Sequence, residues 1–337
     1  MEGLGGTKPA VELGLEWLKN HQDPEGFWAD SADAFVTWFK KWDKVVDYNY
    51  DRRNGKIFIE WFKNARTNIT YNCLDRHLTD GRRNKAAIIW QGEPDEDVRV
   101  FTYQMLHDEV NKFASVLKQK GVKRGDRVSL YLPMVPELAI AMLACARIGA
   151  PHTVVFGGFS ADALASRIDD AQAKLVITAD GGWRRGKAID LKTAADEAVE
   201  RTSTVEKMLV VKRVGDAAPA SMVEGRDVWW HDLVEAQAPD CPPVPLDSEH
   251  MLYLLYTSGT TAKPKGIMHT TEGRGAAPLS KPLKSRTPSA ATMILVILEI
   301  IPTRIIHGNR KIIQRKSCRG ISRRRPSRSR PRPGRPR

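Results

Sequence analysis

The chain has 337 residues, 42% of them hydrophobic, which is enough for one large domain or two small ones with a sizeable core. Its formal net charge of +13 suggests an anionic partner, but residues 272–337 hold 18 of the 53 Lys and Arg and only 2 of the 40 Asp and Glu. Residues 1–271 carry 35 basic and 38 acidic side chains. Their net charge therefore gives no indication of an anionic partner.

The cysteines and the apolar runs exclude several other classes of protein. Cys73, Cys145, Cys241 and Cys318 form no CxxC pair, and no Cys/His cluster has zinc spacing, so we expect reduced thiols, no metal site and a cytoplasmic location. The first residues lack the apolar segment of a secretory signal. The longest apolar run, residues 290–301, is about 12 residues long, which is too short to span a bilayer.

The N-terminal part divides into two segments. Residues 1–30 are polar and rich in glycine, and we expect a loosely held lead-in there. Residues 31–85 are rich in aromatic side chains. Four of these have the spacing of one helix face: Phe35, Trp38, Phe39 and Trp42. With Ser31 as N-cap, the pattern predicts a helix docked on a larger core, and an aromatic ligand box is the less favoured alternative.

Between residues 86 and 271, short apolar runs alternate with amphipathic ones. The apolar runs predict strands over 86–90, 127–132, 153–156, 175–178, 207–211 and 252–256. The amphipathic runs predict helices over 102–120, 136–148 and 160–173. Thr102 and Ser160 are expected N-caps, and Gly121 and Gly149 are expected to end helices in the left-handed conformation.

This alternation predicts an α/β fold, with a mostly parallel sheet that helices cover on both sides. In such a sheet ligands bind at the carboxyl ends of the strands. Residues 272–337 differ in kind, because they contain no Phe, Trp, Tyr or Asp but hold 8 of the 20 prolines and 14 arginines. Such a segment cannot bury enough apolar surface to order itself, and we predict a disordered basic tail.

The strongest chemical signal follows the last predicted strand, where residues 256–266 read YTSGTTAKPKG. A loop rich in Ser, Thr and Gly after a strand can point hydroxyl and N–H groups at phosphate oxygens, and lysines add positive charge. It is not a Walker A loop, because Pro264 stands where that motif has its second Gly. A solvated turn is the alternative. The predicted phosphate-binding residues are Thr257, Ser258, Gly259, Thr260, Thr261, Lys263 and Lys265.

This segment resembles the phosphate loop of the adenylate-forming superfamily, which includes acyl-CoA synthetases, luciferases and peptide-synthetase adenylation domains. It departs from the family at Ala262, where Gly or Ser is usual. Because Ala is small, we expect the loop to keep its conformation. Three further stretches resemble AMP-forming acetyl-CoA synthetases: YNCLDRH at 71–77, VVFGGFS at 154–160 and WWHDL at 229–233. The resemblance runs from about Phe27 to Thr271.

In that family a basic cluster holds the 3′-phosphate of coenzyme A. The matching residues here are Arg184, Arg185, Gly186 and Lys187. Two guanidinium groups and an ammonium group beside a glycine suit a phosphate dianion, whereas a solvated basic turn is the alternative. The Trp229–Trp230 pair is expected in the core and not in the site.

The resemblance implies the truncated large domain of the adenylate-forming fold, with residues 31–85 as an acetyl-CoA synthetase N-terminal segment and 86–271 as a partial AMP-binding domain. It implies an ATP-dependent acid–thiol ligase that uses ATP, Mg²⁺, CoA and acetate. Acetate would attack the α-phosphate of Mg-ATP, giving acetyl-AMP and pyrophosphate, and the CoA thiol would then attack the acyl carbon, giving acetyl-CoA and releasing AMP. A ligase for another short acid such as propionate is the alternative, and the oligomeric state stays open.

After Thr271 the resemblance stops abruptly, and we hypothesise a shift of the reading frame near this residue. In the family the acetate pocket, the adenine contacts and the C-terminal lid lie beyond this point, so we expect little or no synthetase activity and poor solubility. An interpretation of a different class is a non-enzymatic protein whose basic tail binds nucleic acid. It is disfavoured, because the tail has no aromatic side chains for base stacking.

Overall fold

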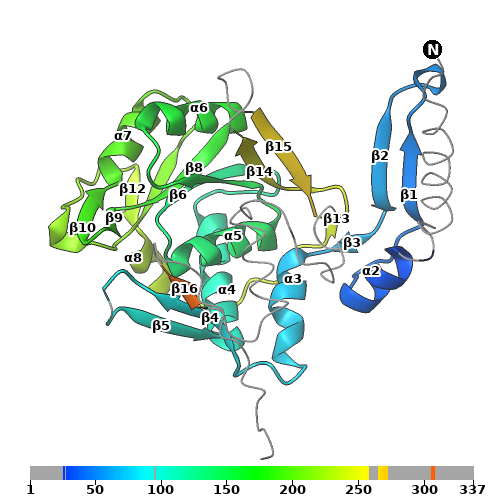
Figure 1. Ribbon diagram of the computed structural model, residues 1–337, viewed down its shortest axis with the longest axis horizontal. Helices are drawn as coiled ribbons and strands as arrows, with labels where there is room; N and C mark the ends of the chain where they lie inside the picture. Colours follow the sequence, from blue (N-terminus) through cyan, green and yellow to red (C-terminus); the bar gives the residue numbers. More distant parts are fainter. Residues whose placement is uncertain (1–25, 27, 95, 258–264, 272–304, 308–337) are drawn as a thin grey trace, which may run out of the picture.

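The computed structural model describes residues 26, 28–94, 96–257, 265–271 and 305–307, and a seven-stranded sheet lies at its centre (Figure 1). The strand order is β12-β11-β8-β6-β7-β14-β15. The strands are β6 (Arg127–Leu132), β7 (His152–Phe156), β8 (Ala173–Ala179), β11 (Lys207–Val211), β12 (Asp227–Trp229), β14 (Met251–Thr257) and β15 (Lys265–Thr270). All neighbours pair in parallel except β14 and β15, which confirms the predicted mostly parallel sheet.

Helices cover both faces of this sheet (Figure 1). Those on one face are α4 (Tyr103–Gln119), α5 (Pro136–Ile148) and α8 (Trp230–Glu235), and those on the other are α6 (Ala161–Ala171) and α7 (Lys192–Glu200). The α/β fold predicted from the alternating pattern is therefore confirmed. The Trp229–Trp230 pair belongs to the core as expected, because the Trp230 ring stacks on Phe113 with 3.6 Å between centroids.

Local signals explain where these helices begin and end. The Thr102 hydroxyl accepts the Met105 N–H at 3.2 Å and caps α4, and Gly121 follows it with a φ of 85°. Pro136 opens α5, and Gly149 ends it in the left-handed conformation with a φ of 73°. The Ser160 hydroxyl caps α6 through the Ala163 N–H, as predicted.

A smaller sheet lies beside the central one, built on β4 (Ala86–Gln91) and β5 (Val98–Thr102), which pair in an antiparallel manner. Its third strand, β16 (Ile305–His307), pairs in parallel with β4. These three residues of the predicted disordered tail form a strand, because the open edge of β4 provides backbone hydrogen-bond partners. The rest of the tail, 272–304 and 308–337, lies outside the described residues.

The predicted helix over 31–42 is wrong beyond its first turns. α2 spans Ala29–Phe35, and Val36 leaves the helix with φ −119° and ψ 131°. The next segment instead pairs with the chain at Arg66, whose carbonyl accepts the N–H groups of Phe39 and Lys40. Backbone pairing has thus overridden the apolar periodicity. The buried side chains of this segment belong to a second hydrophobic cluster and not to the larger core. Most of the predicted lead-in, residues 1–30, lies outside the described residues.

The aromatic side chains of this segment form a core of their own. Trp38, Trp42 and Trp61 pack around buried Phe62, beside the hairpin of β1 (Lys44–Asn49) and β2 (Phe58–Lys63). Figure 1 shows this hairpin standing apart from the central sheet. The remaining short elements of the N-terminal half are η2 (Arg52–Asn54), β3 (Arg66–Thr67), α3 (Ile69–Cys73) and η3 (Asp75–Leu78).

Buried polar contacts join this part to the central domain. The Asn68 amide donates to the carbonyls of Ala146 and Arg147 at 3.1 Å each. Arg147 makes two 2.8 Å hydrogen bonds to the Asp75 carboxylate. Burial would raise the pKa of Asp75, but the hydrogen bonds from Arg147 and His107 outweigh it and lower that pKa to about 2. Residues 71–77 therefore help to connect the N-terminal part to the central domain.

Candidate functional site

The carboxyl ends of the parallel strands meet at one edge of the central sheet, where ligands bind in folds of this class. β14 ends at Thr257 and pairs with β7, which in turn pairs with β6, so these three strand ends lie side by side. β8 ends at Ala179 on the far side of β6. Both predicted anion-binding segments leave from this edge, one after β14 and the other after β8.

The structure describes only the two ends of the predicted phosphate loop. Thr257 closes β14 and is the register partner of Lys265, which opens β15, so the loop between them is held by a paired hairpin. Lys265 is exposed. The residues of the loop itself, which include Ser258, Gly259, Thr260, Thr261 and Lys263, lie outside the described residues.

The strand that leads into this loop is anchored from the helix beside it. The Tyr256 hydroxyl donates to the Asp170 carboxylate of α6 at 2.7 Å. Burial raises the pKa of this phenol, and the bond to Asp170 adds to the rise, so the hydroxyl keeps its proton. A Cβ at Gly266 would lie 3.1 Å from the Tyr256 ring, so the close approach of the two strands favours glycine there.

The predicted basic cluster occupies the tip of a β-hairpin. β9 (Gly181–Arg184) and β10 (Lys187–Asp190) pair through the register partners Arg184 and Lys187. The turn residues Arg185 and Gly186 have φ values of 55° and 74°, the left-handed pair that two-residue hairpin turns require. All four predicted residues are exposed, and none of the ion pairs within the described residues holds their charges.

Asp180 fixes the base of this hairpin, a role that sequence reasoning missed. Its buried carboxylate accepts the backbone N–H groups of Gly181 at 2.7 Å, Arg213 at 2.7 Å and Gly215 at 2.8 Å. It also accepts the Val214 N–H at 3.1 Å. One side chain therefore ties the start of β9 to the turn after β11. The only sequence signal was an acidic residue after an apolar strand, which is also common in solvated turns.

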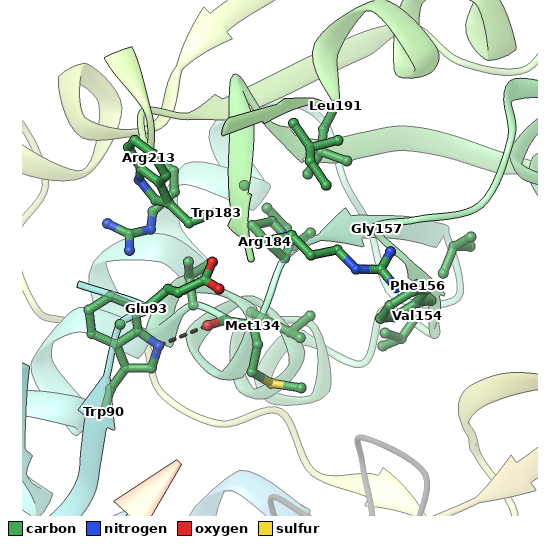
Figure 2. Close-up of a pocket in the computed structure, with 18 of the residues that line it drawn as sticks. Trp90, Glu93, Met134, Val154, Phe156, Gly157, Trp183, Arg184, Leu191 and Arg213 are labelled. Carbon is green, nitrogen blue, oxygen red and sulfur yellow. Dashed lines mark hydrogen bonds between the residues drawn. The ribbon is translucent and has the colours of Figure 1, made fainter. Parts of the chain in front are cut away.

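A cavity of about 330 Å³ opens at the same edge, and Figure 2 shows its lining. The walls come from the ends of β4, β6 and β7, from β9 and from the turn after β11. They include Trp90, Glu93, Met134, Val154, Phe156, Gly157, Trp183, Arg184, Leu191, Arg213 and Leu255. In Figure 2 the Arg184 side chain extends across the cavity toward Phe156. The lining is mainly apolar with a few charged groups, which is the usual character of a small-molecule site.

Trp90 forms a rigid wall of this cavity. Its indole N–H donates to the Met134 carbonyl at 2.8 Å. The guanidinium carbons of Arg99 and Arg213 each lie 4.9 Å from its ring centroid. Arg213 also forms a 2.6 Å ion pair with Asp97. Sequence reasoning missed these residues, because segments far apart in the chain bring them together.

Other kinds of site find no support in the part of the chain that the structure describes. It contains no group of three or more His, Cys, Asp or Glu side chains that could hold a metal ion. Among its helices, none combines the length and apolar character needed to cross a bilayer. Cys145 and Cys241 are buried free thiols.

Comparison with known proteins gives a consistent assignment. The model of a family described as "AMP-binding enzyme" matches residues 74–294, and that of "Acetyl-coenzyme A synthetase N-terminus" matches residues 17–73. The two matches cover a longer interval than the 27–271 inferred from the motifs. The chain resembles the solved structure of acetoacetyl-CoA synthetase from Streptomyces lividans, with a TM-score of 0.67 and 25% identity over 77% of this chain and 38% of that one.

Curated relatives agree with this. The chain is 53% identical over 265 residues to an acetyl-coenzyme A synthetase of Leptospira biflexa, which covers 78% of this chain and 40% of that protein. It is 53% identical over 252 residues to that of Rubrobacter xylanophilus, covering 75% of this chain and 38% of the relative. The chain thus spans about two fifths of the length of these relatives. Because the first family model matches more than half of its residues, the chain belongs to the AMP-binding enzyme family.

Proposed function

We propose that this chain carries the polyphosphate-binding and coenzyme-binding part of an AMP-forming acetate–CoA ligase. One observation carries the proposal: a single cavity at the carboxyl edge of the sheet is bordered both by Arg184 and by Leu255, two residues before Thr257. A ligase that joins an adenylate to a thiol needs its nucleotide and its coenzyme within reach of each other. The names of the similar curated proteins support acetate as the acid.

In this proposal each basic segment binds one phosphate group. The exposed ammonium group of Lys265 and the predicted loop after Thr257 hold the β- and γ-phosphates of ATP, which neutralises charge as acetate attacks the α-phosphate. Arg184, Arg185 and Lys187, with the turn at Gly186, hold the 3′-phosphate of coenzyme A. Their unpaired charges leave donors available for a phosphate, and the prearranged hairpin turn leaves little backbone ordering to occur on binding.

Magnesium enters this scheme with the substrate. The described residues offer no acidic cluster for it. Mg²⁺ commonly reaches such sites bound to nucleotide phosphates, with one or two carboxylates from the protein. Free buried thiols at Cys145 and Cys241 support our placing the protein in the cytoplasm.

The test compares coenzyme A with 3′-dephospho-coenzyme A, two ligands that differ only in the phosphate assigned to the hairpin. Binding to the 337-residue chain is measured by isothermal titration calorimetry. We expect coenzyme A to bind about 10-fold or more tightly than the dephospho form, and Arg184→Ala to remove most of that preference. Arg53→Ala, at an exposed arginine of the N-terminal segment, is the matched control. Equal affinities for the two ligands would refute the assignment of the hairpin.

A further inference from the structure

Arg167 is a buried cation at the same edge of the sheet that no sequence motif singled out. It lies on α6 and is only 8% exposed. Its guanidinium carbon lies 4.7 Å from the ring centroid of Phe159, in the turn after β7, and 5.6 Å from that of Tyr256, near the end of β14. Arg167 therefore lies where β7 and β14 end, and its contact residue Tyr256 directly precedes Thr257, the first residue of the predicted phosphate-binding segment.

Within the described residues the charge of Arg167 has no acidic partner. Its one hydrogen bond there goes from Nη1 to the Ala163 carbonyl, one turn back on the same helix, at 2.6 Å. Asp170, one turn further along α6, accepts the Tyr256 hydroxyl instead. A guanidinium has five N–H donors, so four are left without an acceptor among the described residues. None of its nitrogens is among the fully buried atoms that lack a partner, so the unused donors keep some contact with solvent.

The other buried cations in the described part of the chain are fully compensated. Arg147 makes two hydrogen bonds to the Asp75 carboxylate. Lys192 contacts Asp196 at 2.6 Å and Asp227 at 2.8 Å. Burying a charge without a counter-charge is costly, and proteins normally avoid it by pairing. Arg167 departs from this pattern at the place where an anion is expected to bind.

We propose that Arg167 binds the polyphosphate of a nucleoside triphosphate, or the pyrophosphate released from it, through its unused N–H groups. The flat guanidinium is held by the two aromatic rings and can present two parallel donors to phosphate oxygens. The bound anion then supplies the missing counter-charge. The inference rests on the proposed function, since it assigns the polyphosphate of that function a cation on α6.

The experiment measures the affinity of the 337-residue chain for pyrophosphate, ATP and AMP, each with Mg²⁺, by isothermal titration calorimetry. The main variant is Arg167→Met, which keeps most of the length but removes the charge. We expect it to weaken pyrophosphate and ATP binding about 10- to 100-fold, the loss of two charge-assisted hydrogen bonds, and AMP binding less than about threefold. Similar losses for ATP and pyrophosphate place the contact on the β- and γ-phosphates.

Three further variants separate the possible outcomes. Arg167→Lys keeps the charge without the planar fork, and we expect binding to weaken about three- to tenfold; it also serves as the test if the Met variant does not fold. Arg201→Met removes an exposed arginine of the adjacent α7 segment and should bind as the wild type does. Lys265→Met tests the proposed function itself, because it removes a cation assigned to the phosphate loop.

Absence of pyrophosphate binding by the wild type, or unchanged binding in Lys265→Met, contradicts the proposed function. If binding is lost in Lys265→Met but unchanged in the folded Arg167 variants, the polyphosphate site stands and the role of Arg167 is refuted. Arg167 would then be a packing residue that only stacks on Phe159 and Tyr256.

Discussion

His152 makes the stability of the central sheet depend on pH in a way that can be calculated. It opens β7, and its register partners are Val128 on β6 and Tyr253 on β14. Its ring lies 5.9 Å from that of Tyr253, on whose ring His269 stacks, and neither of its nitrogens has a hydrogen-bond partner among the described residues. Burial lowers the pKa of His152 to about 4, from 6.5 for an exposed imidazole.

Burial opposes protonation of the His152 imidazole in the folded chain, whereas the unfolded chain protonates it freely. Acid therefore favours unfolding. The stabilisation is complete above pH 6.5 and is lost as the pH falls toward 4. Relative to pH 7.5, the lowered pKa reduces the free energy of unfolding by about 3 kcal/mol below pH 4 and by about 1.4 kcal/mol at pH 5.5. Replacing His152 with Phe keeps an aromatic ring, places no polar atom at this buried position and removes the group that titrates.

The assay is urea unfolding followed by tryptophan fluorescence at pH 7.5 and 5.5. Other histidines also have shifted pKa values: burial lowers the pKa of His77 and His250, while that of His107 is raised because its hydrogen bonds to the carboxylates of Asp75 and Asp108 outweigh its burial. We therefore compare the loss of unfolding free energy in the wild type with that in His152→Phe, and use His231→Gln at the surface as the control. Equal losses in wild type and His152→Phe would refute the reasoning.

Further predictions concern the buried charge network, the core and the base of the hairpin. Lys192→Met removes the 2.8 Å partner of Asp227, whose side chain has no exposed area but keeps its 2.6 Å ion pair with Arg226, and we expect a loss of about 1–3 kcal/mol in chemical denaturation, which an unchanged midpoint would contradict. Trp230→Ala removes the ring stacked on Phe113 and should cost about 3–5 kcal/mol in the same assay, where an unchanged midpoint would contradict its core role. Asp180→Asn should weaken coenzyme A binding about 10-fold and leave pyrophosphate binding within about twofold by calorimetry, because it loosens only the β9–β10 hairpin; equal weakening of both ligands would show a general loss of structure.

The elements with local stop and start signals could be predicted almost residue by residue. α4 and α5 begin at Thr102 and Pro136 because a capping hydroxyl and a proline act within one turn, and both end where glycine adopts positive φ. The helix over 31–42 could not be predicted, because backbone pairing with Arg66 competes with it from more than 20 residues away. Apolar periodicity does not report such a competing partner.

The candidate site was only partly predictable for the same physical reason. Arg184 to Lys187 could be found, because charged residues beside a glycine match a family motif within four positions. Trp90, Arg213 and Arg167 could not. Each has the sequence context of an ordinary aromatic or basic residue. The fold alone brings two arginines to the Trp90 ring and leaves Arg167 without a carboxylate partner among the described residues.

Asp180 shows how the site depends on contacts that no motif records. Its carboxylate gathers N–H groups from the base of the hairpin and from the turn after β11, and these two segments carry Arg184 and Arg213, the cations that line the cavity. A water molecule could satisfy the same N–H groups one by one, but it would not hold the two segments at a fixed separation. The separation of the two cations, and with it the size of anion the cavity accepts, therefore depends on a buried acid that need not touch the ligand.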